Sequence, residues 1–298
     1  YNLSGEAGQG LLLYARGIAG SVTLTLLKPD GSFQASYANR VEAVLPVTGT
    51  YTVFVSYSPS GVNGDFSLSY FRGADNVSEI APFISGMITP GWLDVNQIKS
   101  FKIEATAGQY VMLYSSNSSS MNIRAYHPDG SPWTNYSNRF AQTFPQTGTY
   151  TFALTYSTAV SGAYVLYNVR GAQSVSHGFL NSGETYSGFL FPTGLNSYKF
   201  RGVANSPITV TVTASFSRAM AFIHPDGTYW RAAFTSTTLP PASGNYTLVL
   251  MGSTTSASGS YTINVTTTTP NKPPSDPEKE DAPGPVSYTH LRAHETLR

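Results

Sequence analysis

The strongest constraint on the fold of this chain is an internal repeat. Pro-Asp-Gly begins at Pro29, Pro128 and Pro225, at spacings of 99 and 97 residues, and apolar residues at alternating positions precede each copy. Proline fixes φ, aspartate bonds back to the backbone and glycine accepts a positive φ, so each copy predicts a turn between two strands. A repeat of this length indicates tandem copies of one module, each large enough for its own core.

A second repeated motif follows each turn and ends in tyrosine. It runs from Leu45-Pro46 to Tyr51 in copy one, from Phe144-Pro145 to Tyr150 in copy two, and from Leu239-Pro240 to Tyr246 in copy three. The β-forming residues after each tyrosine predict strands over 51–57, 150–156 and 246–250. Further strands are predicted over 65–71, 163–169 and 260–265, and we expect each to pair with the strand before it as a hairpin.

The boundaries of the modules follow from these motifs. Ala7-Gly8-Gln9 matches Ala107-Gly108-Gln109, so copy one enters late and lacks its first one or two strands. Copies one and two both end in Arg-Gly-Ala. We therefore predict a truncated module over 1–74 and complete modules over 75–172 and 173–268, and the short joints between them predict a semi-rigid rod.

The repeat dissolves near Thr266. Residues 269–285, rich in Pro, Thr and charge, predict a disordered linker. Within the tail 286–298, residues 286–296 resemble the in-frame translation of a sequencing-library adapter, so we exclude the tail from the fold. On this interpretation the chain is a fragment cut at both ends.

The composition is typical of an extracellular β protein. The chain has 20 Tyr, 16 Phe and 27 Gly but only 11% charged residues, and its net charge is +1. The 17 Lys and Arg are scattered, which argues against a nucleic-acid partner. The chain contains no run of 18 apolar residues, so the sequence predicts no membrane span. The absence of Cys excludes disulfides and thiol chemistry. We predict an all-β fold of tandem antiparallel, jelly-roll-like β-sandwiches.

Taken together, Ala-Gly-Gln, Pro-Asp-Gly, Thr-Gly-Thr-Tyr and the closing strands resemble the bacterial pre-peptidase C-terminal (PPC) domain family, over residues 1 to about 268. The resemblance implies antiparallel sandwiches attached to secreted hydrolases or arrayed on surface proteins, and therefore a secreted or cell-surface location. Some members resemble carbohydrate- or collagen-binding modules, and some bind calcium near the domain start. The corresponding residues are Asp94 and Asn96, and calcium there is the one cofactor left open.

Aromatic side chains are the best candidates for a binding surface. Phe33, Trp133, Tyr229 and Trp230 follow the three turns, and Tyr136 lies a few residues further on. Such rings at the rim of a sandwich stack on sugar rings, which predicts a platform for an extracellular polysaccharide or another matrix polymer. The alternative is that they cover the core or pack against the neighbouring module.

The chain carries no recognisable catalytic set of residues. His127 and His224 share one repeat position beside the turn, which favours a structural role. We therefore predict a non-catalytic spacer, adhesion or substrate-targeting array, whose modules are monomeric units of a longer protein. Two alternatives stay open: an accessory region of a secreted protease or glycosidase whose catalytic domain lies elsewhere, and a purely structural stalk.

Overall fold

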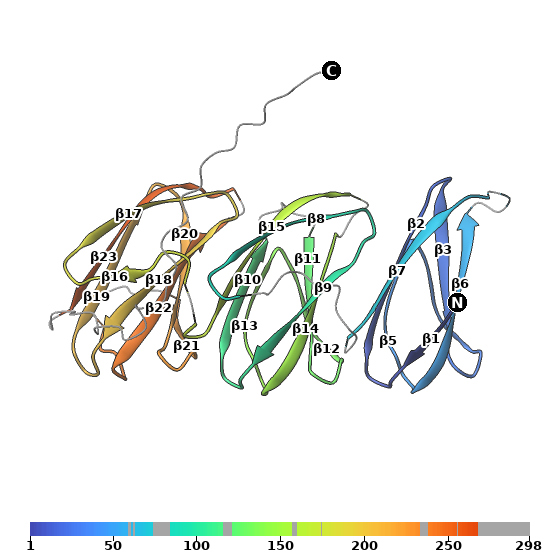
Figure 1. Ribbon diagram of the computed structural model, residues 1–298, viewed down its shortest axis with the longest axis horizontal. Helices are drawn as coiled ribbons and strands as arrows, with labels where there is room; N and C mark the ends of the chain where they lie inside the picture. Colours follow the sequence, from blue (N-terminus) through green and yellow to red (C-terminus); the bar gives the residue numbers. More distant parts are fainter. Residues whose placement is uncertain are drawn as a thin grey trace, which may run out of the picture.

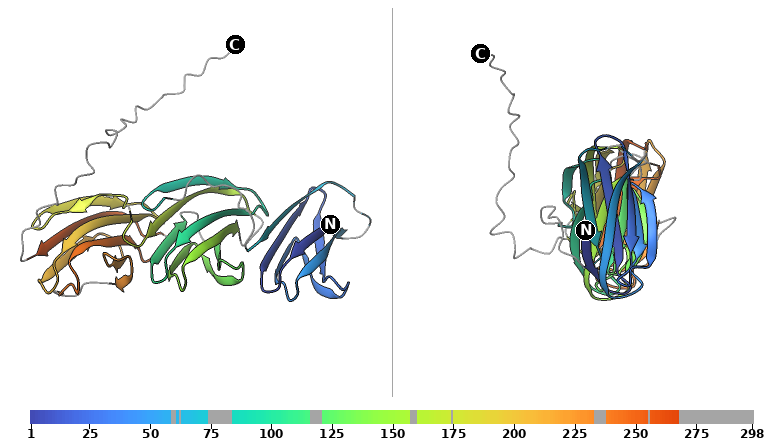
Figure 2. Two further views of the ribbon diagram at one scale, coloured as in Figure 1. Left: turned by 60° about the horizontal axis from the view of Figure 1, so that its bottom comes forward. Right: turned by 90° about the vertical axis from the view of Figure 1, so that its right-hand side faces the viewer.

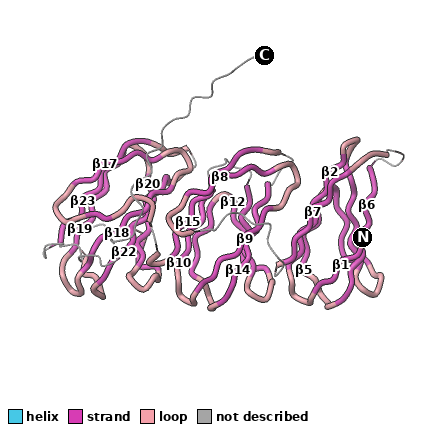
Figure 3. Tube along the Cα trace, in the orientation of Figure 1, coloured by secondary structure: helices cyan, strands magenta, loops and turns pink. Residues whose placement is uncertain are grey.

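The computed structural model describes residues 1–58, 61, 63–73, 84–115, 121–156, 160–173, 175–232, 238–254 and 256–267. The predicted linker over 269–285 and the tail over 286–298 lie outside them. The described residues form 23 strands, and none of these residues belongs to a helix that could cross a membrane. Three sandwiches follow one another in chain order and form a single row (Figures 1 and 2). Strands and loops make up the whole described trace, which confirms the predicted all-β fold (Figure 3).

The first sandwich consists of a four-stranded sheet, β1-β6-β3-β4, and a three-stranded sheet, β5-β2-β7. Its strands are β1 Asn2–Gly5, β2 Gly10–Gly17, β3 Ser21–Leu27, β4 Phe33–Ala38, β5 Arg40–Val44, β6 Gly49–Ser58 and β7 Phe66–Arg72.

The second sandwich pairs the sheets β12-β11-β14-β9 and β13-β10-β15-β8. Its strands are β8 Ile88–Leu93, β9 Lys99–Ala105, β10 Tyr110–Ser115, β11 Met121–Tyr126, β12 Pro132–Ser137, β13 Arg139–Thr143, β14 Gly148–Tyr156 and β15 Gly162–Arg170. β1 matches only the end of β9, and the described part of the first sandwich contains no counterpart of β8.

The third sandwich pairs the sheets β16-β18-β22-β20-β21 and β17-β23-β19. Its strands are β16 Phe179–Leu180, β17 Thr185–Leu190, β18 Leu195–Gly202, β19 Ile208–Ala214, β20 Arg218–Ile223, β21 Tyr229–Arg231, β22 Gly244–Gly252 and β23 Gly259–Thr267. All pairings between named strands are antiparallel except the short parallel pair of β16 and β18.

We call the sheets that contain β6, β14 and β22 the leading sheets, and the sheets that contain β2, β10 and β19 the trailing sheets. Each sandwich encloses a separate core between its two sheets. In the second sandwich Phe101, Phe140 and Phe152 are buried there, and the rings of Phe101 and Phe152 stack with centroids 5.3 Å apart. The cores of the first and third sandwiches occupy the same place.

The hairpins predicted for the closing strands are wrong. β7 pairs with β2 in the trailing sheet, and β15 and β23 likewise leave the sheet of the strand before them. The reason is that β6 already has β1 and β3 on its two edges, so no edge remains for β7. Each closing strand therefore crosses to the other sheet and completes the sandwich.

The two repeated motifs contact each other inside each sandwich. Gly49 has a φ of 155°, and a Cβ there would lie 2.6 Å from Cγ of Pro29 in the turn. Gly148 and Gly244 have the same conformation against Pro128 and Pro225, so no side chain fits at this glycine. The tyrosine of the motif folds back on its own loop, where the Tyr51 hydroxyl donates to the carbonyl of Val47 over 2.7 Å.

Candidate functional site

The most elaborate contacts outside the cores lie where one sandwich meets the next. At these joints the trailing sheet of one sandwich packs against the leading sheet of the following one. Burial along the strands shows this directly, because β14 and β22 are buried on both faces over 150–156 and 246–252. A strand at a sandwich surface exposes alternate residues, as β6 does.

The backbone of the first joint is built from three glycines. The N–H of Gly10 donates to the carbonyl of Gly130 over 3.0 Å, and the N–H of Gly73 donates to the carbonyl of Gly10 over 2.9 Å. Gly130 belongs to a Pro-Asp-Gly turn and Gly73 to the Arg-Gly-Ala motif. A Cβ on Gly73 would overlap the carbonyl oxygen of Gly130, so only glycine permits this approach.

The second joint repeats this backbone arrangement. Here the N–H of Tyr110 donates to the carbonyl of Gly227 over 2.9 Å, and the N–H of Gly171 donates to the carbonyl of Tyr110 over 2.7 Å. Tyr110 takes the place of Gly10, since each follows an Ala-Gly-Gln motif. The turns and the Arg-Gly-Ala motifs therefore act between sandwiches as well as within them.

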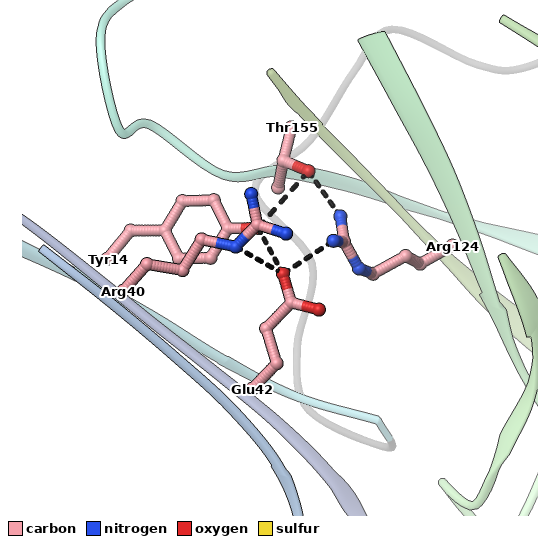
Figure 4. A network of polar contacts seen from close by, with 5 residues as sticks. All are labelled: Tyr14, Arg40, Glu42, Arg124 and Thr155. Atoms are coloured by element: carbon pink, nitrogen blue, oxygen red, sulfur yellow. Dashed lines mark hydrogen bonds and ion pairs between the residues drawn. The ribbon is translucent and has the colours of Figure 1, made fainter. Parts of the chain in front are cut away.

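The side chains of the first joint form an ionic network (Figure 4). Oε1 of Glu42 on β5 lies 2.5 Å from Nη2 of Arg124 on β11 and 2.6 Å from Nε of Arg40. The Tyr14 hydroxyl donates to the same oxygen over 2.8 Å, and Arg124 also donates to the Thr155 hydroxyl. Apolar contacts surround the network, including Phe71 and Tyr126 with ring centroids 5.0 Å apart.

Burial and charge compete at this network. Only 6% of the Arg124 side chain is accessible, against 32% of the Glu42 side chain. Burial raises the pKa of the Glu42 carboxyl, but the charge of Arg124, the hydrogen bond from Tyr14 and the charge of Arg40 together hold that pKa below its usual value. Burial raises the pKa of the Tyr14 hydroxyl to about 12, so tyrosine stays a neutral donor.

The second joint has apolar residues at the corresponding positions. The strand registers equate Glu42, Arg124 and Thr155 of the first joint with Ala141, Ala221 and Met251 of the second. Ala221 and Met251 are buried there in one cluster with Met112 and Tyr114. Lys199 on β18 also lies at this joint, and its ammonium donates to the carbonyl of Ala172 over 2.6 Å. Burial lowers the pKa of Lys199 to about 8.

The predicted aromatic platform is divided among three different environments. Trp133 packs on the core of the second sandwich, with its ring 5.2 Å from those of Phe140 and Tyr150. Trp230 packs on the third core in the same way, 4.8 Å from Tyr246. The structure therefore places the two tryptophans as covers of the cores and not beside the exposed rings.

Strand register explains this division. Phe33 and Tyr229 occupy equivalent positions, since they pair with Leu27 and Ile223. This position comes one residue before the one that Trp133 and Trp230 occupy. Successive side chains on a strand point to opposite faces, so this single step separates the rings. Tyr229 lies in the second joint, 4.8 Å from Tyr110. Phe33 is 63% exposed.

Tyr136 is 37% exposed, and its hydroxyl accepts a hydrogen bond from Gln142. The candidate calcium residues also make local contacts. The Trp92 indole donates to the Asp94 carboxylate over 2.9 Å, and the side-chain amide of Asn96 donates to the carbonyl of Ala15 across the first joint over 2.6 Å. Across the described ranges, no three His, Asp or Glu side chains form a group that could hold a metal. Calcium binding stays a prediction.

The aspartates of the turns have structural partners. Asp30 accepts a hydrogen bond from the N–H of Ser32 over 2.9 Å, and Asp129 and Asp226 repeat this bond. Hydrogen bonds from Ser32 lower the pKa of Asp30. His127 and His224 lie against the core tryptophans, with ring centroids 5.6 and 5.1 Å apart.

Two kinds of hollow lie at the surface. A cleft of about 340 Å³ opens at the first joint, between Leu12, Glu42, Arg124 and Trp133. Polar hollows of about 470 and 490 Å³ recur in the first and second sandwiches beside Arg72 and Arg170. Arg170 donates to the carbonyl of Glu104, and Arg72 donates to that of Ser4, so these arginines connect the two sheets of one sandwich.

Comparisons with known proteins leave the family open. No family model matches the chain, and no curated protein matches it. Tripeptidyl peptidase 2 is similar at 10% identity and a TM-score of 0.20, over 90% of this chain, which spans 32% of that protein. A Sulfolobus turreted icosahedral virus structure is similar at 12% identity and a TM-score of 0.18, over 87% of this chain and 79% of the other. An archaeal virus protein described by a triple jelly roll fold and turret assembly is similar at 12% identity and a TM-score of 0.16, over 89% and 80%. The PPC resemblance thus stays a prediction.

Proposed function

We propose that the chain is a rigid, non-catalytic spacer within a longer secreted or cell-surface protein, in which stacked β-sandwiches hold the attached parts at a fixed separation. The observation that carries this proposal is the repetition of one joint. Both joints use the same backbone hydrogen bond to a turn glycine and the same packing of trailing sheet on leading sheet. A flexible tether needs neither feature.

The location outside the cell rests on the PPC resemblance and on the composition. The role of an accessory region beside a hydrolytic domain fits the same geometry, because a rigid spacer also positions a catalytic domain. A purely structural stalk is the limiting case, in which the sandwiches bind nothing.

Rigidity is tested by a distance measurement between the first and third sandwiches. The chain has no Cys, so Ser58→Cys and Ser187→Cys introduce two unique, exposed sites for spin labels. The spacer proposal expects one narrow distance distribution. Adding Gly73→Val, which obstructs the first joint, should broaden it. A distribution that is broad without this substitution contradicts the proposal.

Polymer binding is a second proposal, and it rests on the exposed rings of Phe33 and Tyr136. Retention of the chain on immobilised polysaccharides tests it. Phe33→Ala and Tyr136→Ala should each reduce retention, whereas Tyr70→Ala, which removes a ring that is 60% exposed on β7, should not. Equal loss in all three variants, or no retention of the parent chain, refutes polymer binding at these rings.

A further inference from the structure

The row has two free ends, and they differ in chemistry. One end is the leading sheet of the first sandwich, and the other is the trailing sheet of the third. β6 alternates between buried and exposed residues where β14 and β22 are buried on both faces. β19 alternates likewise, where β2 is buried on both faces.

The free leading sheet exposes apolar side chains at joint positions. Phe54 is 56% exposed and corresponds to Ala153 and Val249, which are fully buried in the two joints. Phe33 is 63% exposed and corresponds to Tyr229, which packs on Tyr110 across the second joint. Leu27 pairs with Phe33 and is the diagonal neighbour of Phe54, so the three side chains lie together.

The turn glycine of this sheet is accessible and has the conformation of the turn glycines in the two joints. Gly31 is exposed, whereas Gly130 and Gly227, which accept the hydrogen bonds from the preceding sandwich, are buried. Gly31 has the same positive φ as those two glycines, 81° against 83° and 90°, so its turn has the same conformation.

We propose that the leading sheet of the first sandwich is a docking face for the trailing sheet of one further sandwich of this same type. The proposal rests on the proposed spacer function, since it extends the same joint. The partner would donate a backbone N–H to the carbonyl of Gly31 and cover Leu27, Phe33 and Phe54.

The partner's chemistry follows from the residues that take the places of the ionic network. Thr25 corresponds to Arg124, and Ser56 corresponds to Thr155, so this face offers hydroxyls and no cation at these places. An acid in the position of Glu42 would lack the buried cation that Arg124 supplies across the first joint. The partner therefore carries a neutral residue there, as Ala141 does in the second joint.

The other end of the row is a cap. Thr209, Thr211 and Thr266 stand where the first two sandwiches have Leu12, Tyr14 and Phe71, or Met112, Tyr114 and Val169. Pro207 stands at the position of Tyr110 and has no N–H to donate to a turn glycine. A polar outer face of this kind ends a stack of repeats. A further sandwich can therefore be added through this kind of joint only at the leading sheet of the first sandwich.

The two ends are tested by converting the cap in the full chain. Pro207→Tyr, Thr209→Met, Thr211→Tyr and Thr266→Val give the third sandwich the residues of the second at these positions, and Thr268→Gly supplies the glycine that Gly73 and Gly171 provide in the two joints. We expect this variant to associate head to tail and to raise its weight-average mass in analytical ultracentrifugation at least twofold, while the parent chain stays monomeric. Adding Phe54→Asp, which places a carboxylate on the docking face, should restore the monomer.

Association that persists with Phe54→Asp overturns the proposal, because it shows general adhesion of the new apolar face. A folded variant that stays monomeric overturns it too. If this variant does not fold, by circular dichroism, the triple variant Thr209→Met, Thr266→Val and Thr268→Gly is judged by the same criteria. The distance distribution within one chain reports rigidity separately, so failure of docking and failure of the spacer function are distinguishable.

Discussion

Removing the carboxylate of the first joint is the sharpest test of how the sandwiches are held together. Glu42→Ala leaves the Arg124 guanidinium, whose side chain is only 6% accessible, with the Thr155 hydroxyl as its remaining partner in the network. Arg124→Ala instead leaves Glu42 beside Arg40 and partly in water. The double variant reproduces the pair Ala141 and Ala221 of the second joint.

The magnitudes follow from burial. Breaking a buried ion pair from one side costs about 3–5 kcal/mol, and a hydrogen bond to a charged group contributes about 1.5–3 kcal/mol. Because 32% of Glu42 is accessible, we expect the lower range, about 2 kcal/mol for opening the joint in Glu42→Ala. Arg124→Ala should cost about 1 kcal/mol. The double variant should cost about 1 kcal/mol as well, which gives a coupling energy of about 2 kcal/mol.

Amide hydrogen exchange measures this opening directly. The Gly10 N–H is bonded across the first joint and the Tyr110 N–H across the second, so one experiment contains its own control. Glu42→Ala should accelerate exchange at Gly10 about 30-fold, since 1.4 kcal/mol corresponds to a factor of ten, and leave Tyr110 unchanged. The reasoning fails if exchange at Gly10 is unaffected by Glu42→Ala. It also fails if the change in opening free energy of the double variant equals the sum of those of the two single variants.

Three further predictions concern acid, the joint glycine and the core tryptophan. The pKa of Glu42 is lowered in the folded joint, so its ionised form stabilises the joint above the unfolded pKa of about 4.3, and this stabilisation is lost as the pH falls through the folded pKa. Amide exchange across the first joint, corrected for intrinsic rates, should therefore be faster at pH 3, while exchange across the second joint stays unchanged. Gly73→Ala should open the first joint without unfolding either sandwich, and Gly20→Ala, which meets its nearest atom at 3.7 Å, should have no effect; equal exchange in both variants refutes the close approach. Trp133→Ala should reduce the free energy of unfolding by about 3–5 kcal/mol, and Phe33→Ala should change it by less than about 0.5 kcal/mol; urea unfolding measures both, and a small effect of Trp133→Ala would contradict its place on the core.

The sequence predicts the strands and turns well because local chemistry determines them. Pro-Asp-Gly at Pro29 forms the expected turn between β3 and β4, and the run after Tyr51 forms β6. The hairpin predicted for 65–71 is wrong because pairing depends on which sheet edges are already occupied, and that is decided by distant strands.

The joints are not predicted, because their side chains differ between repeats. Glu42 and Ala141 share a position but no chemistry, so self-comparison finds nothing there. One signal was nevertheless present. The apolar runs over 111–114 and 248–251 are continuous, whereas 208–213 alternates apolar residues with threonine. Continuous runs indicate strands buried on both faces, and alternation indicates a free face.

The five aromatic residues do not form one surface, for a related reason. Phe33 and Trp133 both follow a turn closely, but one residue separates their positions, and in a strand that step exchanges the core for the surface. Distance along the sequence from a turn is therefore too coarse to place a ring on a β-sheet.

The contrast between the ionic and the apolar joint also limits how such a chain can be shortened. Deletion of the middle module would seat the face of Glu42 on that of Ala221 and Met251. The Glu42 carboxylate would then keep Arg40 but lose Arg124, the more buried of its two cations. The number of modules can therefore change without weakening the row only where the two newly apposed faces are complementary in charge.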